Sequence, residues 1–235
     1  DFDKLFVILP FEKDFFEVKH NFPVEFVGHP LIDAIHNRKK TDEVQFRKEN
    51  HLDEKPIIAI LPGSRKQEIS KMLSVMLSVV NDFTDYQFVI AGAPSQEFEF
   101  YQQFLTTKNV KFVSNKTYDL LSISTAALVT SGTATLETAL FKVPEVVCYK
   151  GGWISYQIAK RIITLKYISL VNLIMDSEVV TELIQEECNQ KRIKEELSKL
   201  LETTHRNKLL ANYDILETKL GGLGASQKTA QLIVK

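Results

Sequence analysis

PIIAILPGSRKQEISKMLSVMLSVVND (Pro56–Asp82) begins as an unbroken apolar run and then changes to an amphipathic pattern. The apolar run Pro56–Leu61 predicts a strand that is buried on both faces, and the pattern from Arg65 to Asp82 predicts a helix. A tight Pro-Gly-Ser turn separates the two. A strand that leads through a glycine turn into a helix is the repeating unit of an α/β fold.

The same alternation of apolar strands and helices continues beyond this unit. Four further apolar runs predict strands: Gln87–Ala91, Val110–Val113, Ala127–Thr130 and Val146–Tyr149. Helices are predicted over Ser95–Thr106 and Thr117–Ser124, and from the Ser131-Gly132-Thr133 turn to near Phe141. Beyond Gly151 the chain is predicted to be mostly helical, over Trp153–Leu165, Glu178–Cys188, Gln190–Thr203 and a final stretch to Lys235. This order indicates a Rossmann-like, doubly wound parallel sheet with helices on both faces.

The residues before Pro56 divide into two further parts. Two short strands are predicted at Lys4–Leu9 and Val24–Val27, with a helix over Phe11–Lys19 between them. The charged segment Asn37–Lys55 predicts a linker with a helix over Asp42–Asn50. We therefore expect residues 1–36 to end a preceding domain, 37–55 to connect, and 56–235 to form one domain with a helical tail. Two strands and one helix would leave apolar faces uncovered, so a first domain of comparable size is expected before Asp1.

Composition excludes several classes of function. The net charge of −1 offers no concentrated basic surface for nucleic acid. No apolar run approaches the roughly 20 residues that cross a bilayer, and the first residues lack the pattern of a signal peptide. The five histidines form no HxH or HExxH pair, so no metal is expected. The two cysteines, Cys148 and Cys188, fit small core residues of a reduced, cytosolic protein.

The turn Leu61-Pro62-Gly63-Ser64-Arg65 is a candidate anion site. It lies where a parallel strand ends and a helix begins, so that free N–H groups and the helix dipole favour a negative charge. Gly63 allows close backbone approach, Ser64 offers a hydroxyl, and Arg65 can bind a phosphate with two hydrogen bonds. The alternative is that Ser64 only caps the helix, with Gln67 completing a capping box.

A second turn, Ser131-Gly132-Thr133, has the same position at the end of another predicted strand. Glu137 follows Thr133 by four residues, one residue too far for a capping box and one helical turn from the predicted anion site. A carboxylate there can accept hydrogen bonds from the two hydroxyls of a ribose. Ligands of doubly wound sheets bind at the carboxyl ends of the strands. The two turns together therefore predict a nucleoside diphosphate site.

Other nucleotide motifs do not occur. The sequence contains no GxxxxGK[ST] run of a P-loop, and no GxGxxG follows the first strand of the predicted sheet, which disfavours a nicotinamide cofactor. No cofactor is expected.

Six runs are distinctive, in chain order LPFEKDFF (Leu9–Phe16), FVGHPLID (Phe26–Asp33), LPGSRKQEI (Leu61–Ile69), LVTSGTATLETAL (Leu128–Leu140), AKRIITLKYISLVNLI (Ala159–Ile174) and ELIQEEC (Glu182–Cys188). Together they resemble the lipid-A-disaccharide synthase family of glycosyltransferases. They span nearly the whole chain, and the pair LPGSR with SGTATLE is highly specific. The resemblance implies the C-terminal half of a GT-B glycosyltransferase with two Rossmann-like domains, whose tail crosses back toward the other domain or a partner subunit.

The resemblance also implies a reaction. UDP-2,3-diacylglucosamine donates its sugar to the lipid acceptor 2,3-diacylglucosamine 1-phosphate with inversion, which gives the disaccharide 1-phosphate and UDP. By the same resemblance Gly63, Ser64 and Arg65 meet the phosphates, Ser131, Gly132 and Thr133 the diphosphate or sugar, and Glu137 the ribose. Asn172 is a further candidate, although Val171 stands where the family more usually has proline. Gln185 and Glu186 are predicted on a helix and carry little weight.

An inverting transfer also needs a general base. The family's candidate acids lie before Asp1, and His29, on the Gly28–Pro30 turn, is the one candidate in this chain, with a structural role as the alternative. We therefore expect the isolated chain to bind UDP and to lack activity.

The lipid substrates imply an enzyme of a Gram-negative bacterium, cytoplasmic and peripheral on the inner face of the inner membrane. The basic, aromatic segment Trp153–Tyr167 can lie on anionic headgroups or can be an ordinary core helix. A homodimer through an uncovered apolar face is also left open. Two other functions remain: another GT-B enzyme that uses a UDP-sugar, similar to UDP-GlcNAc 2-epimerase or to the lipid II glycosyltransferase, and a non-catalytic nucleotide-binding or scaffold domain.

Overall fold

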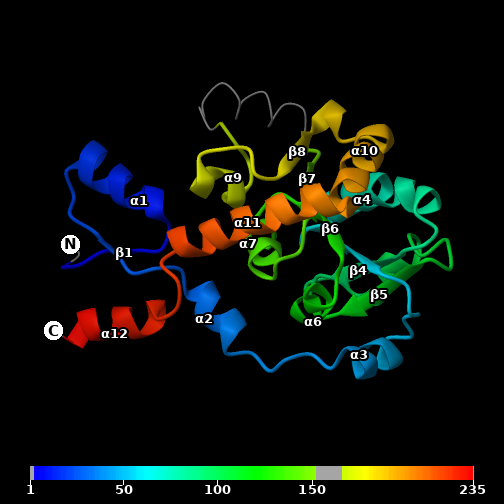
Figure 1. The fold of residues 1–235 in the computed structure, drawn as a ribbon, viewed down its shortest axis with the longest axis horizontal. Coiled ribbons are helices and arrows are strands. Elements are labelled where there is room, and N and C mark those ends of the chain that lie inside the picture. Colours follow the sequence, from blue (N-terminus) through cyan, green and yellow to red (C-terminus); the bar gives the residue numbers. More distant parts are fainter. Residues whose placement is uncertain (1–2, 152–165, 235) are drawn as a thin grey trace.

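The predicted parallel sheet is present in the computed structural model, which describes residues 3–151 and 166–234 (Figure 1). Six strands pair in parallel in the order β5-β4-β3-β6-β7-β8. Their bounds are β3 Ile57–Leu61, β4 Gln87–Gly92, β5 Val110–Ser114, β6 Ala126–Thr130, β7 Glu145–Tyr149 and β8 Thr181–Ile184. From β3 the chain builds outward to β5 and then returns to the other side of β3 with β6. The order of strands therefore reverses between β3 and β6.

Helices cover both faces of this sheet, because alternate residues of its buried strands point to opposite sides. Ile58 and Ile60 of β3 join the larger core cluster, whereas Ile57, Ala59 and Leu61 join the smaller one. The larger cluster is covered by α4 (Lys66–Met76, continued as a 3₁₀ segment over Leu77–Asp82), α5 (Phe98–Gln102), α7 (Thr133–Leu140), α9 (Leu170–Met175), α10 (Gln190–Leu201) and α11 (Thr203–Lys219). The smaller is covered by α3 (Glu43–Glu49) and α6 (Thr117–Ser122). The expected doubly wound architecture is confirmed.

A small lobe precedes the sheet. Its strands β1 (Phe6–Val7) and β2 (Glu25–Phe26) pair in parallel, and α1 (Pro10–Asp14) continues as a π-helical turn over Phe15–Lys19. The C-terminal helix α12 (Ala225–Val234) packs beside these strands, far from α10 in Figure 1. Lys228 donates a hydrogen bond to the carbonyl of Phe26 at 2.6 Å, and Lys4 donates to that of Leu232 at 2.9 Å. The two ends of the chain thus share one lobe.

Two backbone crossings join the lobe to the sheet and touch each other. The first, Val27–His29, leads into α2 (Pro30–His36), whose Ile32 is buried in the larger core cluster. The second, Leu220–Gly224, leads from α11 to α12. The N–H of His29 donates to the carbonyl of Leu220 at 2.9 Å, and a Cβ on Gly221 would lie only 3.0 Å from the Cα of Gly28. All three glycines of the second crossing have positive φ angles.

The helix predicted over Glu178–Cys188 is wrong. Thr181–Ile184 forms the edge strand β8, which pairs with β7 from Val146↔Thr181 to Tyr149↔Ile184, and only the short stretch Gln185–Glu187 turns as a 3₁₀ helix. The β-branched residues before Glu182 fit a pleated edge strand, and pairing with β7 outweighs the helical preference of the glutamates. The sheet therefore has six strands rather than the five predicted. The helix predicted over Trp153–Leu165 lies outside the described residues.

Candidate functional site

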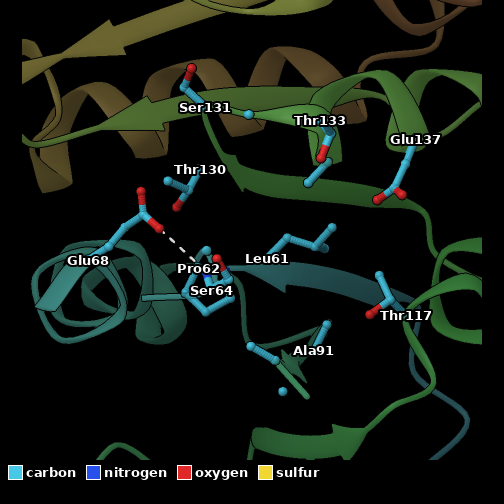
Figure 2. A pocket seen from close by; sticks show the side chains of 15 residues that line it. Leu61, Pro62, Ser64, Glu68, Ala91, Thr117, Thr130, Ser131, Thr133 and Glu137 are labelled. Carbon is cyan, nitrogen blue, oxygen red and sulfur yellow. Dashed lines mark hydrogen bonds between the residues drawn. The ribbon is translucent and has the colours of Figure 1, made fainter. Parts of the chain in front are cut away.

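Both predicted turns line one pocket at the carboxyl ends of β3 and β6, where the strand order reverses (Figure 2). A reversal of this kind opens a crevice between neighbouring loops, and doubly wound sheets bind their ligands there. The pocket has a volume of about 230 Å³. It is lined by Leu61, Pro62, Gly63, Ser64, Glu68, Ala91, Gly92, Ala93, Thr117, Thr130, Ser131, Gly132, Thr133, Ala134 and Glu137. Six of the predicted residues are brought together here: Gly63, Ser64, Ser131, Gly132, Thr133 and Glu137.

The first turn brings its backbone to the pocket. Gly63 has a φ of +99°, which side chains rarely adopt, and α4 begins only at Lys66, with Arg65 as its N-cap. The capping box with Ser64 and Gln67 is therefore not formed. Ser64 instead donates its N–H to the carboxylate of Glu68 at 3.3 Å. Arg65 is exposed at the start of α4 and is not among the lining residues.

The second turn presents its backbone and the side chain of Thr133 to the pocket. Gly132, the N-cap of α7, has a φ of +155°, and a Cβ there would meet nothing within 4 Å. The Ser131 hydroxyl is turned away and donates to the carbonyl of Ile168 at 2.8 Å. The open space at Gly132 leads to the first N–H groups of α7, which lack acceptors within the helix. An anion can therefore approach this helix without obstruction.

Glu137 lies one turn into α7 and is held by Tyr118 of α6. The Tyr118 hydroxyl donates to Oε1 of Glu137 at 2.7 Å. Burial raises the pKa of Glu137, and the hydrogen bond from Tyr118 acts against that rise. Burial and the neighbouring carboxylate raise the pKa of Tyr118, so its proton stays in place. Glu137 points toward the pocket in Figure 2, and Thr117, the first residue of α6, also lines it. The sequence carried no signal for this pairing across 19 residues.

Thr130 is a further lining residue that was not predicted. It ends β6, is only 3% exposed, and its hydroxyl has no hydrogen-bond partner among the described residues. A buried hydroxyl without a partner is costly, and a ligand in the pocket would supply one. Its signal in the sequence was its place as the one polar residue of an otherwise apolar strand.

Asn172 is fully buried and lies outside the pocket lining. Its amide donates to the carbonyl of Val180 and to Glu182, each at 2.8 Å, and accepts from the N–H groups of Val179 and Val180. Glu182 also accepts from the backbone N–H groups of Ile168 and Ser169. This network fixes the segment whose Ile168 carbonyl holds Ser131. Asn172 therefore helps to position Ser131 through this network and does not itself line the pocket.

We expect Asn172→Ala to destabilise the chain by about 2–4 kcal/mol, because the N–H groups of Val179 and Val180 would lose their acceptor, and the Val180 carbonyl and Glu182 would each lose one donor. Urea unfolding followed by circular dichroism measures the change. Asn207→Ala is the control, since Asn207 is exposed on α11, and it should shift stability by less than about 0.5 kcal/mol. Equal urea midpoints for the two variants would contradict the role given to Asn172.

His29 has a local structural role. It is the N-cap of α2, where its Nδ1 accepts from the N–H of Leu31 at 3.2 Å. Burial lowers its pKa, and it is not among the residues that line the pocket. These contacts favour the structural alternative over a catalytic one.

Comparisons with known proteins support the resemblance seen in the sequence. The family model described as lipid-A-disaccharide synthetase matches residues 1–234. The lipid-A-disaccharide synthase of Idiomarina loihiensis is 36% identical over 98% of this chain and 62% of its own length. That of Syntrophus aciditrophicus is 35% identical over 97% of this chain and 61% of its own length. The chain thus spans about 62% of the curated relatives that it matches.

Solved structures of low sequence identity share the fold. UDP-GlcNAc 2-epimerase from Neisseria meningitidis, bound to UDP-GlcNAc, has a TM-score of 0.66 at 16% identity and covers 97% of this chain and 60% of its own. WaaG, a glycosyltransferase involved in lipopolysaccharide biosynthesis, has a TM-score of 0.50 at 15% identity and covers 89% and 57%. The fold is that of GT-B glycosyltransferases and epimerases. The epimerase alternative shares only this fold, and by its sequence the chain belongs to the lipid-A-disaccharide synthetase family.

Proposed function

We propose that this chain forms the nucleotide-sugar half of a lipid-A-disaccharide synthase. The complete enzyme would transfer 2,3-diacylglucosamine from its UDP derivative to 2,3-diacylglucosamine 1-phosphate and release UDP. The observation that carries the proposal is the meeting of two helix-initiating glycine turns and Glu137 in one pocket at the reversal of the strand order. The family supports the same reaction.

Each wall of the pocket suits one part of UDP. The turns at Gly63 and Gly132 offer backbone N–H groups and two helix N-termini to the diphosphate. Thr130 offers a buried hydroxyl beside them, and Glu137 can accept hydrogen bonds from the ribose. During transfer, negative charge builds on the departing diphosphate, and fixed N–H groups stabilise it without reorganising. Arg65, exposed at the start of α4, can turn toward a bound phosphate.

The acceptor side of the reaction is assigned to residues outside this chain. We propose that the general base and the acceptor pocket belong to the part of the enzyme that this chain does not include. We also propose that the complete enzyme works at the cytoplasmic face of the inner membrane of a Gram-negative bacterium, because both of its substrates are lipids. No helix within residues 3–151 and 166–234 is long and apolar enough to cross a membrane.

Calorimetry with UDP, UDP-GlcNAc and ADP tests the nucleotide site. We expect the chain to bind UDP and UDP-GlcNAc, to bind ADP more weakly, and to form no disaccharide from the lipid substrates. The absence of any nucleotide binding would favour a non-catalytic domain. Measurable disaccharide formation by the chain alone would contradict the assignment of the base to the missing part.

A further inference from the structure

The phosphate-binding turn already contains a negative charge from the protein itself. Glu68 is the third residue of α4, and its Oε2 accepts from the N–H of Ser64 at 3.3 Å. A Cβ built on Gly63 would have three atoms of the Glu68 side chain as its nearest neighbours, the carboxylate first. In Figure 2 the side chain of Glu68 extends into the pocket, and a dashed line joins it to Ser64. The carboxylate therefore fills the space beside Gly63 that a side chain at that position would need.

This contact differs from ordinary helix capping. In a capping box, the acid at the third helical position bonds to the N–H of the N-cap residue while a side chain of the N-cap bonds in return. The N-cap of α4 is Arg65, which makes no such bond, and Glu68 reaches past it to the turn. Thr130, in the same pocket, keeps its buried hydroxyl without a partner among the described residues. Glu68 thus supplies a hydrogen-bond acceptor to the first turn but not to the hydroxyl of Thr130.

We propose that Glu68 is an internal substitute for phosphate, which fills the Gly63 turn when the site is empty and must move aside when a diphosphate binds. This inference rests on the proposed function and adds a residue that sets the affinity for its nucleotide. The Glu68 carboxylate and a phosphate cannot both accept from the Ser64 N–H at close range, because their negative charges repel. Glu68 therefore weakens the binding of UDP and, after transfer, returns to the turn and favours release of the UDP product.

The consequence is specific to the phosphate end of the ligand. Uridine would reach Glu137 without entering the Gly63 turn, so Glu68 should leave its affinity unchanged. If Glu68 only stabilised the start of α4, loss of its carboxylate would loosen the whole turn and change the affinities for uridine and for UDP alike. The two ligands separate these explanations.

The test measures UDP by calorimetry and uridine by displacement of UDP, in the wild-type chain and in Glu68→Gln. We expect Glu68→Gln to bind UDP about 10-fold more tightly, equivalent to about 1.4 kcal/mol, with uridine unchanged. Glu68→Ala should behave in the same way and serves if Glu68→Gln folds poorly, which urea unfolding shows. Glu99→Gln is the matched control, because Glu99 is an exposed acid on α5 outside the pocket lining.

Three results would overturn the inference. If the wild type binds UDP and both Glu68 variants bind it equally or more weakly, Glu68 does not compete with phosphate and the proposed function stands. If the Glu68 variants bind UDP and uridine more tightly by the same factor, or if Glu99→Gln raises the affinity for UDP as much, the effect is not local to the Gly63 turn. If neither the wild type nor the variants bind UDP, the proposed function itself fails and the inference fails with it.

Discussion

Glu137→Ala is expected to lower the affinity of the chain for UDP by about 10- to 100-fold, because hydrogen bonds to a charged group contribute about 1.5–3 kcal/mol. The carboxylate is half-buried, and Tyr118 holds one of its oxygens at 2.7 Å. Its orientation toward the pocket is therefore fixed before a ligand arrives, which spares part of the entropy of ordering the side chain. Calorimetry with UDP measures the loss.

A ligand without ribose hydroxyls shows whether the loss comes from the proposed contact. UDP and its 2′,3′-dideoxy analogue should differ in affinity for the wild type and bind nearly alike to Glu137→Ala. Tyr118→Phe should weaken UDP by a smaller factor, since it frees the carboxylate to rotate but does not remove it. If Glu137→Ala weakens both ligands equally, Glu137 does not contact the ribose.

Replacement of Glu145 by methionine is expected to stabilise the chain by at least about 2 kcal/mol at pH 8, because a carboxyl group buried without partners is costly. Glu145 is the first residue of β7 and is fully buried. Neither of its oxygens has a hydrogen-bond partner among the described residues, and the same holds for the hydroxyl of Tyr213. Methionine has a similar length and no polar hydrogen-bonding group to satisfy.

The pH dependence of this effect follows from the direction of the pKa shift. Burial raises the pKa of Glu145 well above its usual value, so the folded state keeps a proton that the unfolded state loses above about pH 4.3. Stability is therefore highest below the unfolded pKa and falls by up to about 1.4 kcal/mol per pH unit as pH rises toward the folded pKa. Glu145→Met removes this dependence, and the difference between the proteins should grow from pH 4 to pH 8.

Thermal unfolding across this pH range checks both parts of the prediction. In a domain of this size, each 1 kcal/mol shifts the melting temperature by about 2–4 °C. The control is Glu178→Gln, because Glu178 and Glu145 line one surface cavity and Glu178 is exposed. A gain in stability for Glu145→Met that is the same at pH 4 and pH 8 would show that the buried acid is not the cause.

The sheet and the place of the site could be predicted because both depend on local patterns. A strand buried on both faces is an unbroken apolar run, as in Ile57–Leu61, and parallel strands bring their carboxyl ends to one edge. The turns at Gly63 and Gly132 therefore had to meet. β8 was mistaken for a helix because glutamates stand in and around it, at positions 178, 182, 186 and 187, and its strand character depends on pairing with β7.

The contacts of individual side chains could not be predicted in this way. Tyr118 reaches Glu137 from a helix that covers the other face of the sheet, and Asn172 is buried only because β8 is a strand. Arg65 was expected to line the pocket since it follows the turn, but α4 begins at the next residue and leaves it exposed. Glu68, three residues further, lies where the helix geometry turns its carboxylate back toward the turn.

The two crossings, at Gly28 and Gly221, both connect the small lobe to the sheet and lie in contact with each other. A single flexible connection would let the lobe rotate relative to the sheet about any axis. Two adjacent connections permit rotation about the line that joins them and resist rotation about other axes. Each swing must change torsion angles in both links at once, and the glycines there can take up such changes without side-chain clashes. Lengthening only one link by a residue would tilt the lobe relative to the sheet.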